Sequence, residues 1–355
     1  MRPSPFPHHG PLAPDQVHGR DELVADLVAR LTAHRPTVVV APRRFGKTSL
    51  VGRVAAELAD TVTIVRIDLY ELRSWADLAG RLAAGLAGVT GPRRSALDRI
   101  AASLDVNLGV VRASFRRPQR PEPDLTADRL LDVLVQHGST TPTVVILDEF
   151  SSIRRVDGAA GLLRTKLQHH LHEIGLVFAG SEPSTMRLLF EDTDQPFYAQ
   201  ADLLVVPPLD LAGFTAIVDA GFEGRPPDGL AAAIHGFTGG HPQRSMQLAD
   251  AAWSAVEQGS TSAWAEALEA VRRAAAPGSE TRFSATAPAD QAVLRLVAAG
   301  EPLFGRAAQL LELSRSSAQN SRSRLLANGQ IDESDGRYVV VDPLYGDWIA
   351  HRLPL

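Results

Sequence analysis

The stretch "TVVVAPRRFGKTSL", residues 37–50, constrains the fold more than any other part of the sequence. Its residues Val38 to Val40 are wholly apolar and predict a short strand of the kind that is covered on both faces in a parallel sheet. A glycine-lysine-threonine turn follows, and the residues after it read as a helix. A strand that passes through such a turn into a helix is the building unit of an α/β sheet.

The turn follows the phosphate-binding pattern G-x-x-x-x-G-K-[ST], except that its first glycine is Ala41. In such a loop, successive backbone N–H groups and the next helix N-terminus point at a phosphate. Gly46 allows close approach of the backbone, Lys47 would reach the β- and γ-phosphates, and Thr48 would offer its hydroxyl to Mg²⁺. An alanine is acceptable at position 41 if its φ is negative, which the following proline favours. The predicted ATP or ADP contacts from the loop are Ala41, Pro42, Arg43, Arg44, Phe45, Gly46, Lys47, Thr48 and Ser49.

A second apolar strand, "TVVILDEF", ends in two acids, Asp148 and Glu149. Ligands of parallel sheets lie beyond the carboxyl ends of the strands, so both carboxylates are expected beside the phosphate loop. There Asp148 would hold Mg²⁺ through water, and Glu149 would polarise the attacking water. The alternative interpretation is a solvated acidic loop after a core strand.

A third strand end, in "LVFAGSEP", carries Ser181. A small polar residue at this edge can hydrogen-bond the γ-phosphate or the nucleophilic water. A purely structural serine is the competing interpretation.

The pattern of strands and helices divides the chain into four parts. A proline-punctuated arm spans residues 1–19, and strands alternate with helices over 20–209, which predicts a doubly wound parallel α/β core. Residues 210–280 are alanine-rich and predict a helical lid, and a small-residue linker, "APGSETRFSATAP", leads to a C-terminal unit over 285–355. The strands are expected at residues 38–40, 61–70, 143–150, 176–180 and 201–209.

An insert over residues 88–122 is less regular and basic. It holds seven arginines against three acids, and either a solvated loop or a surface for nucleic acid or another acidic partner would have this composition. The arginines are Arg93, Arg94, Arg99, Arg112, Arg116, Arg117 and Arg120.

Composition excludes several classes of function. The chain has no cysteine, which rules out disulfides, zinc ribbons and thiol catalysis. Its net charge of −5 gives no general basic field, and no apolar run approaches the ~18 residues of a membrane span. The proline-rich N-terminus lacks the apolar centre of a signal peptide, so a cytoplasmic protein is expected. His169, His170 and His172 point in different directions on a helix and predict a solvated helix end instead of a metal site.

The C-terminal unit has the pattern of a winged helix-turn-helix, with three helices followed by a hairpin that turns at Asp335-Gly336. Its third helix carries three arginines, and this composition can meet phosphates and base edges of DNA. The predicted wing carries three acids, which would repel a phosphate backbone. DNA contact and docking onto a protein surface therefore both remain open. The arginines are Arg315, Arg322 and Arg324, and the acids are Asp332, Glu333 and Asp335.

Taken together and in this order, these motifs resemble the archaeal-type P-loop ATPases of the STAND branch, which are close to AAA+ proteins. The resemblance covers nearly the whole chain and departs from the usual family pattern at Ala41 and at Gln200, where an arginine is common. It rests on the segments "PFPHHGPLAPDQVHGRDEL", "APRRFGKTSL", "LDEF", "LLRTKLQHH", "FAGSEPSTMRLLFED", "QPFYAQA" and "GGHPQRSMQLADAAW".

The resemblance implies a five-stranded sheet of order 5-1-4-3-2, a helical lid and a C-terminal winged helix, with the nucleotide held between core and lid. It implies that Gly19 and Arg20 lie beside the adenine and that Pro242 closes over the base from the lid.

The resemblance also makes His241 and Arg244 candidates for sensing the phosphates, although packing within the lid explains them as well. Arg164 would be placed to reach the nucleotide of a neighbouring subunit.

The motifs therefore predict an ATP-binding, slowly hydrolysing switch whose winged helix reports the nucleotide state to a partner. The alternative is a DNA-binding regulator with a structural nucleotide. A small-molecule kinase is disfavoured, because that chemistry needs neither the lid nor the winged helix. The oligomeric state and the client are not indicated by the sequence.

Overall fold

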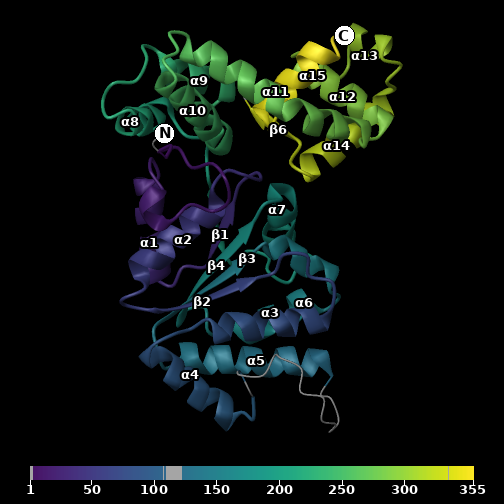
Figure 1. The fold of residues 1–355 in the computed structure, drawn as a ribbon. Coiled ribbons are helices and arrows are strands. Elements are labelled where there is room, and N and C mark those ends of the chain that lie inside the picture. Colours follow the sequence, from purple (N-terminus) through teal and green to yellow (C-terminus); the bar gives the residue numbers. More distant parts are fainter. Residues whose placement is uncertain (1–2, 107, 109–121, 335) are drawn as a thin grey trace.

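A computed structural model describes residues 3–106, 108, 122–334 and 336–355 of the chain (Figure 1). Four arginines of the predicted basic insert, at positions 112, 116, 117 and 120, lie outside the described residues, as does Asp335 of the predicted hairpin turn. Figure 1 shows the parallel sheet with its helices in the lower half, and the helical lid and the C-terminal unit above it.

The core is built on a five-stranded parallel sheet in the order β2-β3-β4-β1-β5. This is the predicted order 5-1-4-3-2 read from the other edge, so that prediction is confirmed. The central strands are buried along their whole length, as their continuous apolar runs require. The strands are β1 (Thr37–Val40), β2 (Thr63–Asp68), β3 (Thr143–Asp148), β4 (Ile174–Gly180) and β5 (Asp202–Val205).

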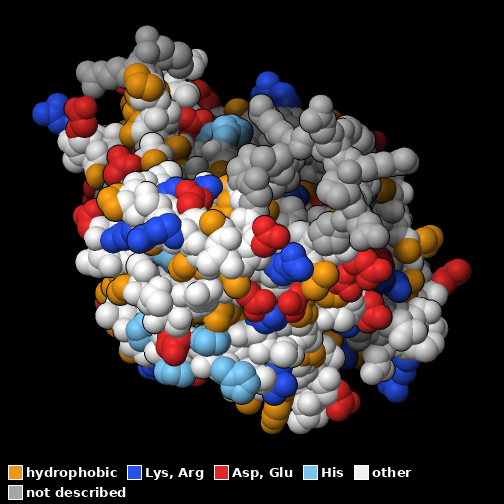
Figure 2. Space-filling model, turned by 90° about the horizontal axis from the view of Figure 1, so that it is seen from below, with side chains coloured by type: hydrophobic (Ala, Val, Ile, Leu, Met, Phe, Trp, Pro, Cys, Tyr) orange, Lys and Arg blue, Asp and Glu red, His pale blue; other side chains and the backbone are white. Residues whose placement is uncertain are grey.

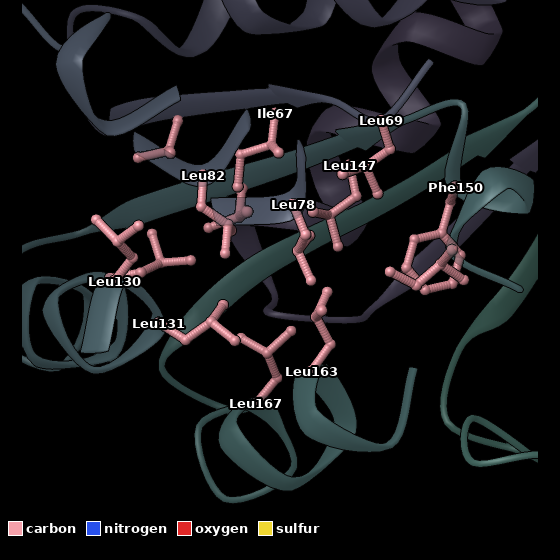
Figure 3. Close-up of a cluster of buried hydrophobic side chains, with 14 of the residues drawn as sticks. Ile67, Leu69, Leu78, Leu82, Leu130, Leu131, Leu147, Phe150, Leu163 and Leu167 are labelled. Carbon is pink, nitrogen blue, oxygen red and sulfur yellow. The ribbon is translucent and has the colours of Figure 1, made fainter. Parts of the chain in front are cut away.

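Helices cover both faces of this sheet. Alternate residues of β1 face opposite ways, so that Val39 packs with one group of helices while Val38 and Val40 pack with the other. The first group is α1 (Asp21–Thr32) and α2 (Lys47–Leu58). The second is α3 (Trp75–Ala87), α4 (Pro92–Ser103), α5 (Pro123–Gly138), α6 (Ala159–Leu167), α7 (Pro183–Glu191) and the 3-10 helix η2 (Phe150–Arg155). Figure 3 shows the leucine-rich interior of the second face.

The insert after α3 is more regular than the sequence suggested, because α4 occupies much of its described part. Arg93 donates hydrogen bonds to the backbone oxygens of Ala59 and Val62, both at 2.5 Å. Arg94 donates to the backbone oxygen of Ala87, the last residue of α3, at 2.7 Å, and also pairs with Asp98 within α4. These arginines therefore fasten α4 to the core. On the face of the molecule in Figure 2, the coloured positive and negative side chains are intermingled.

The lid consists of four helices: α8 (Leu211–Gly221), α9 (Leu230–Thr238), α10 (Pro242–Glu257) and α11 (Ala263–Ser284). The predicted small-residue linker after residue 275 is wrong, since α11 continues through Pro277. A proline removes one helical hydrogen bond, but the alanines before it favour helix and Ser279 beyond it is buried. The helix thus runs from the lid into the C-terminal unit. Arg272 in its lid part pairs with Asp347 of the C-terminal unit at 2.6 Å.

The C-terminal unit shows the predicted succession of three helices and a two-stranded antiparallel hairpin. It adds the helix α15, although the segment "DESDGRYVVVDPLYGDWI" that contains this helix predicted only a hairpin. Asp342 caps this helix by accepting from the Leu344 N–H. The elements are α12 (Pro288–Ala298), α13 (Arg306–Leu310), α14 (Arg315–Ala327), β6 (Ile331–Ser334), β7 (Arg337–Val340) and α15 (Pro343–Arg352).

The N-terminal arm crosses from the lid to the core. Its ring of Phe6 is 1 % exposed and packs in the apolar interior of the lid, against Phe222 and Gly221. Further along, the arm forms a short 3-10 helix, η1 (Pro14–Gln16), beside α2. Among the described residues, no helix is long and apolar enough to cross a membrane.

Because the Phe6 ring fills the lid interior, Phe6→Ala should leave a cavity and lower the free energy of unfolding by roughly 3 kcal/mol. Urea denaturation followed by circular dichroism measures this change. Phe304 is 46 % exposed, so Phe304→Ala serves as the control and should change stability by less than about 0.5 kcal/mol. Equal effects of the two substitutions would contradict the anchoring of the arm.

Candidate nucleotide-binding site

The phosphate loop connects the end of β1 to the start of α2, at the carboxyl edge of the sheet. Arg44 and Gly46 have positive φ angles of 70° and 84°, whereas Ala41 does not. The alanine therefore meets the condition under which it can replace the first glycine. A Cβ on Gly46 would meet no atom within 4 Å, so its left-handed conformation, and not a lack of space, calls for glycine.

Lys47 begins α2 and is 5 % exposed. Its Nζ donates to the backbone oxygen of Ala41 at 3.1 Å, which folds the side chain back over the loop. Burial lowers the pKa of Lys47 to about 8, and the nearby carboxylates of Glu149 and Asp148 oppose this effect. An anionic ligand beside such a buried lysine would stabilise its charged form.

The two acids lie next to this lysine, at the end of β3. Asp148 is 6 % exposed, and its Oδ2 is 2.8 Å from Nη2 of Arg66 on the neighbouring strand β2. Its Oδ1 accepts from the Glu149 N–H. Arg66 was not among the predicted site residues, although a single cation within the half-apolar strand "TIVRID" was a signal that a buried acid lies beside it.

Glu149 and Ser181 are brought together from two neighbouring strands. Glu149 has a positive φ of 51°, a conformation that is costly for a side chain of this size. Its Oε2 accepts a 2.7 Å hydrogen bond from the hydroxyl of Ser181, which follows β4 and is 6 % exposed. Ser181 therefore orients the carboxylate that the sequence singled out.

These groups open into a cleft of about 530 Å³, a volume typical of small-molecule sites. The cleft lies between the phosphate loop, the arm and the first residues of the lid helix α10. Of the predicted site residues, it is lined by Arg20, Arg43, Arg44, Phe45, Gly46, Lys47, Thr48, Ser49, Glu149, Ser181 and Pro242. Gly19, Ala41, Pro42 and Asp148 lie outside its lining.

The arm contributes more to the cleft than the sequence analysis predicted. Residues 7–12 and 16–18 line it, together with Ile217 and Met246 of the lid. The arm is held by a 2.9 Å hydrogen bond from the Leu12 N–H to Ser49 Oγ, and by Gln243, whose side chain donates to the His8 backbone oxygen. The prolines of the arm indicated an extended segment, but its contacts with α10 have no local signal.

Arg20 is largely buried and donates to the backbone oxygen of Pro207 at 2.7 Å and to that of Pro208. Burial lowers its pKa to about 10, and Asp210 opposes the shift. Arg20 thus supports the segment where the core passes into the lid. Gly19 has a φ of 67° and lies against Leu209.

The structure places His241 and Arg244 outside the cleft. The His241 ring is 4 % exposed and packs edge-on against Phe45 of the phosphate loop, with the ring centroids 4.9 Å apart. Burial lowers its pKa to about 4, so the ring is neutral at pH 7. Arg244 forms a double hydrogen bond with Asp342 of the C-terminal unit, at 2.9 and 2.6 Å.

The other residues that the sequence singled out also lie away from the cleft. Arg164 belongs to α6, and His170 pairs with Glu173 at 2.7 Å in the turn after that helix. On α14, Arg324 forms a double hydrogen bond with Asp290. The guanidinium of Arg322 lies over the ring of Tyr338.

Comparisons with known proteins identify the fold. No family model matches the sequence, and no curated protein matches it. Among solved structures, the chain is similar to a Walker-type ATPase of Pyrococcus abyssi, with a TM-score of 0.69 and 19 % identity over 97 % of this chain and 99 % of that one. At this identity the similarity establishes the fold alone: a P-loop α/β core that carries a lid and a C-terminal unit.

Two more distant similarities are those to the Orc1 protein of Aeropyrum pernix, solved in complex with DNA, and to the RuvB branch migration motor of Thermotoga maritima. The Orc1 match has a TM-score of 0.49 and 13 % identity, over 94 % of this chain and 93 % of that one. The RuvB match has a TM-score of 0.47 and 14 % identity, over 97 % of both chains.

Gly46 and Gly52 allow a test of the loop conformation, because a Cβ on either would meet no atom within 4 Å, but only Gly46 has a positive φ. We expect Gly46→Ala to lower the free energy of unfolding by about 1 kcal/mol and to weaken binding of ATP. Gly52→Ala, inside α2, should leave ATP binding unchanged and stabilise the protein slightly. Calorimetric titration and thermal unfolding of both variants measure these effects, and similar behaviour of the two would refute the argument.

The lowered pKa of Lys47 predicts a pH dependence. Above pH 8, Lys47 of the protein without nucleotide is mostly neutral. A bound phosphate raises the pKa of this lysine again, so ATP binding at pH 8.5 should take up most of one proton. At pH 6.5 this lysine should take up none. Calorimetry in two buffers of different ionisation enthalpy counts the protons. Lys47→Arg, which stays charged at both pH values, should abolish the uptake; uptake that persists in this variant would assign it to another group.

Proposed function

We propose that the protein binds ATP with Mg²⁺ in this cleft and hydrolyses it slowly, and that the bound nucleotide gates the position of the lid and the C-terminal unit. The observation that carries this proposal is the meeting of Lys47, Glu149 and Ser181 from three chain segments at one cleft beside a phosphate loop. Phosphoryl transfer needs positioning and charge stabilisation more than covalent chemistry, and such an arrangement supplies both.

In this proposal the loop and Lys47 hold the phosphates. The first residues of α2 line the cleft, and a helix N-terminus at such a place favours an anion. The ammonium of Lys47 donates to the Ala41 oxygen beside the cleft that it lines, and it would bind a β- or γ-phosphate there. Arg43 and Arg44 line the same cleft and add positive charge.

Glu149 accepts the proton of the attacking water. Its carboxylate faces the cleft, and the hydrogen bond from Ser181 restricts its rotation, so that one oxygen remains available to a water. Ser181 acts through Glu149 as a positioning residue. The positive φ of Glu149 supports this role, because strained backbone conformations are frequent at functional sites.

The residues present fit a magnesium ion. Thr48 lines the cleft and Asp148 lies at the same sheet edge, and hydroxyl and carboxylate oxygens are ligands that Mg²⁺ prefers. Thr48 and Asp148 would hold the ion, which would neutralise phosphate charge when bound. The ion pair of Asp148 with Arg66 orients this carboxylate.

The arm and the lid connect the nucleotide cleft to the position of the lid. Phe6 anchors the arm in the lid, Leu12 attaches it to Ser49 of the phosphate loop, and Arg44 hydrogen-bonds Gln243 at the start of α10. A nucleotide between these surfaces would contact core, arm and lid at once, with Pro242 beside the base. Any ligand with such contacts stabilises the closed arrangement over an open one by its difference in affinity.

Our proposal keeps the four-part division into arm (1–19), core (20–209), lid (210–280) and C-terminal unit (285–355), although α11 joins the last two as one helix. It does not include DNA contact by α14. Arg324 and Arg322 are engaged with Asp290 and Tyr338, and a DNA complex would have to displace these partners. Both DNA binding and a cytoplasmic location stay predictions of the sequence.

The test compares two variants of the site. Lys47→Ala should abolish ATP binding, because it removes the buried cation of the loop. Glu149→Gln should retain binding and lower turnover at least 100-fold, because the amide cannot accept the proton. Calorimetric titration and phosphate release measure the two quantities.

The control is Glu191→Gln, which removes a carboxylate at the exposed end of α7 and should change neither quantity. Turnover that survives undiminished in both site variants would refute hydrolysis at this cleft.

A further inference from the structure

A second cavity, of about 910 Å³, lies on the other side of the phosphate loop. Its walls come from three parts of the molecule: Arg43 and Arg44 of the loop, Arg244 and Arg282 of the lid helices α10 and α11, and Tyr345 of α15 in the C-terminal unit. The nucleotide cleft shares only Arg43 and Arg44 with it. The cavity therefore lies at the junction of core, lid and C-terminal unit, and nothing in the proposed hydrolysis uses it.

The wall of this cavity has an excess of positive charge. Five arginines line it, against the two carboxylates of Glu182 and Asp342. Two of the arginines are neutralised, since Arg244 pairs with Asp342 and Arg324 pairs with Asp290 behind the wall.

Three cations on this wall, Arg43, Arg44 and Arg282, have no carboxylate partner among the ion pairs of the described residues. Arg44 hydrogen-bonds the neutral side chain of Gln243, and Arg282 that of Gln330 at 3.2 Å. These neutral partners orient the guanidinium groups and leave their charge uncompensated.

The environment of Arg282 shows that these charges act on one another. Its guanidinium lies over the ring of Tyr345, 4.2 Å from the centroid. Burial lowers the pKa of Arg282, Tyr345 and Asp342 oppose this effect, and the charges of Arg44 and Arg244 add to it. Like charges held this close destabilise one another, and an anion between them would relieve the repulsion.

The ring of Tyr345 supports the cationic wall. Tyr345 is 2 % exposed, and its hydroxyl is enclosed by protein near Thr286. Its ring lies beneath the guanidinium of Arg282, and a cation over an aromatic face is held in place by that face. Tyr345 therefore positions Arg282 at the cavity.

We infer that this junction cavity is a binding site for a second anion, a small molecule that carries two or more phosphate groups, separate from the nucleotide cleft. Guanidinium groups recognise phosphate oxygens through paired hydrogen bonds, and here they converge from three units on one hollow. This convergence favours a compact anion over a nucleic acid, because a nucleic-acid backbone needs cations spread along an extended surface. A ligand there would join the loop, the lid and the C-terminal unit.

The experiment measures the binding of inorganic pyrophosphate to the full chain carrying Lys47→Ala, at low salt and without Mg²⁺. The substitution weakens the phosphate loop, and the low ionic strength preserves the electrostatic attraction. Calorimetric titration should detect one binding event. Adding Arg282→Ala should lower the affinity at least tenfold, and adding Arg282→Gln, which removes the charge but keeps a polar side chain, should lower it similarly.

The matched control is Arg273→Ala, also in the Lys47→Ala background. Arg273 is an exposed arginine of α11 outside the cavity, so its removal changes the net charge equally and should leave the affinity within twofold. Thermal unfolding confirms that each variant is folded, and Arg282→Gln tests the site if Arg282→Ala does not fold.

The inference fails if pyrophosphate does not bind, or if Arg282→Ala and Arg273→Ala have the same effect. Displacement of pyrophosphate by a short DNA duplex at equal phosphate concentration would overturn the assignment to a small molecule. The result is independent of the proposed function: ATP binding to the chain with Lys47 intact is measured separately, and either site can be present without the other.

Discussion

The parallel pairing of β1 with both β4 and β5 is the constraint on which the rest of this structure depends. It places the carboxyl ends of β1, β3 and β4 along one edge, so that the phosphate loop, the acidic pair and Ser181 come within reach of one another. Each of these groups is unfavourable in isolation: a buried lysine with a lowered pKa, a carboxylate in a strained backbone and a buried hydroxyl. The burial of the apolar strands offsets these costs.

The arm and the lid convert this edge into an enclosed site. At one end of the arm, Phe6 packs in the apolar interior of the lid. Further along the arm, the Leu12 N–H donates to Ser49 at the phosphate loop. The lid helix α10 begins at the cleft, where Pro242 and Gln243 face the loop. An element that contacts both sides of a cleft responds to what the cleft contains, and the arm is therefore the part of the chain through which a nucleotide would influence the lid.

Two cavities share the phosphate loop in this molecule. Arg43 and Arg44 line both, His241 packs on Phe45 between them, and Arg244 ties the lid to the C-terminal unit through Asp342. An anion in either cavity would therefore meet the same two loop arginines, Arg43 and Arg44. This arrangement gives the C-terminal unit a physical connection to the loop that does not depend on DNA contact by α14.

The loop and the acidic strand end were predictable from the sequence, because each depends on residues that are close together in the chain, and the order of strands was implied by the family resemblance. The order was confirmed, and the conformation of Ala41 is the one that the loop needs. The continuous helix α11, the helix α4 and the partners of Arg20, Arg66, Arg244 and Arg324 were decided by the tertiary structure. A guanidinium can pair with any carbonyl or carboxylate that folding brings near it, and local spacing carries no information about a partner that lies tens of residues away.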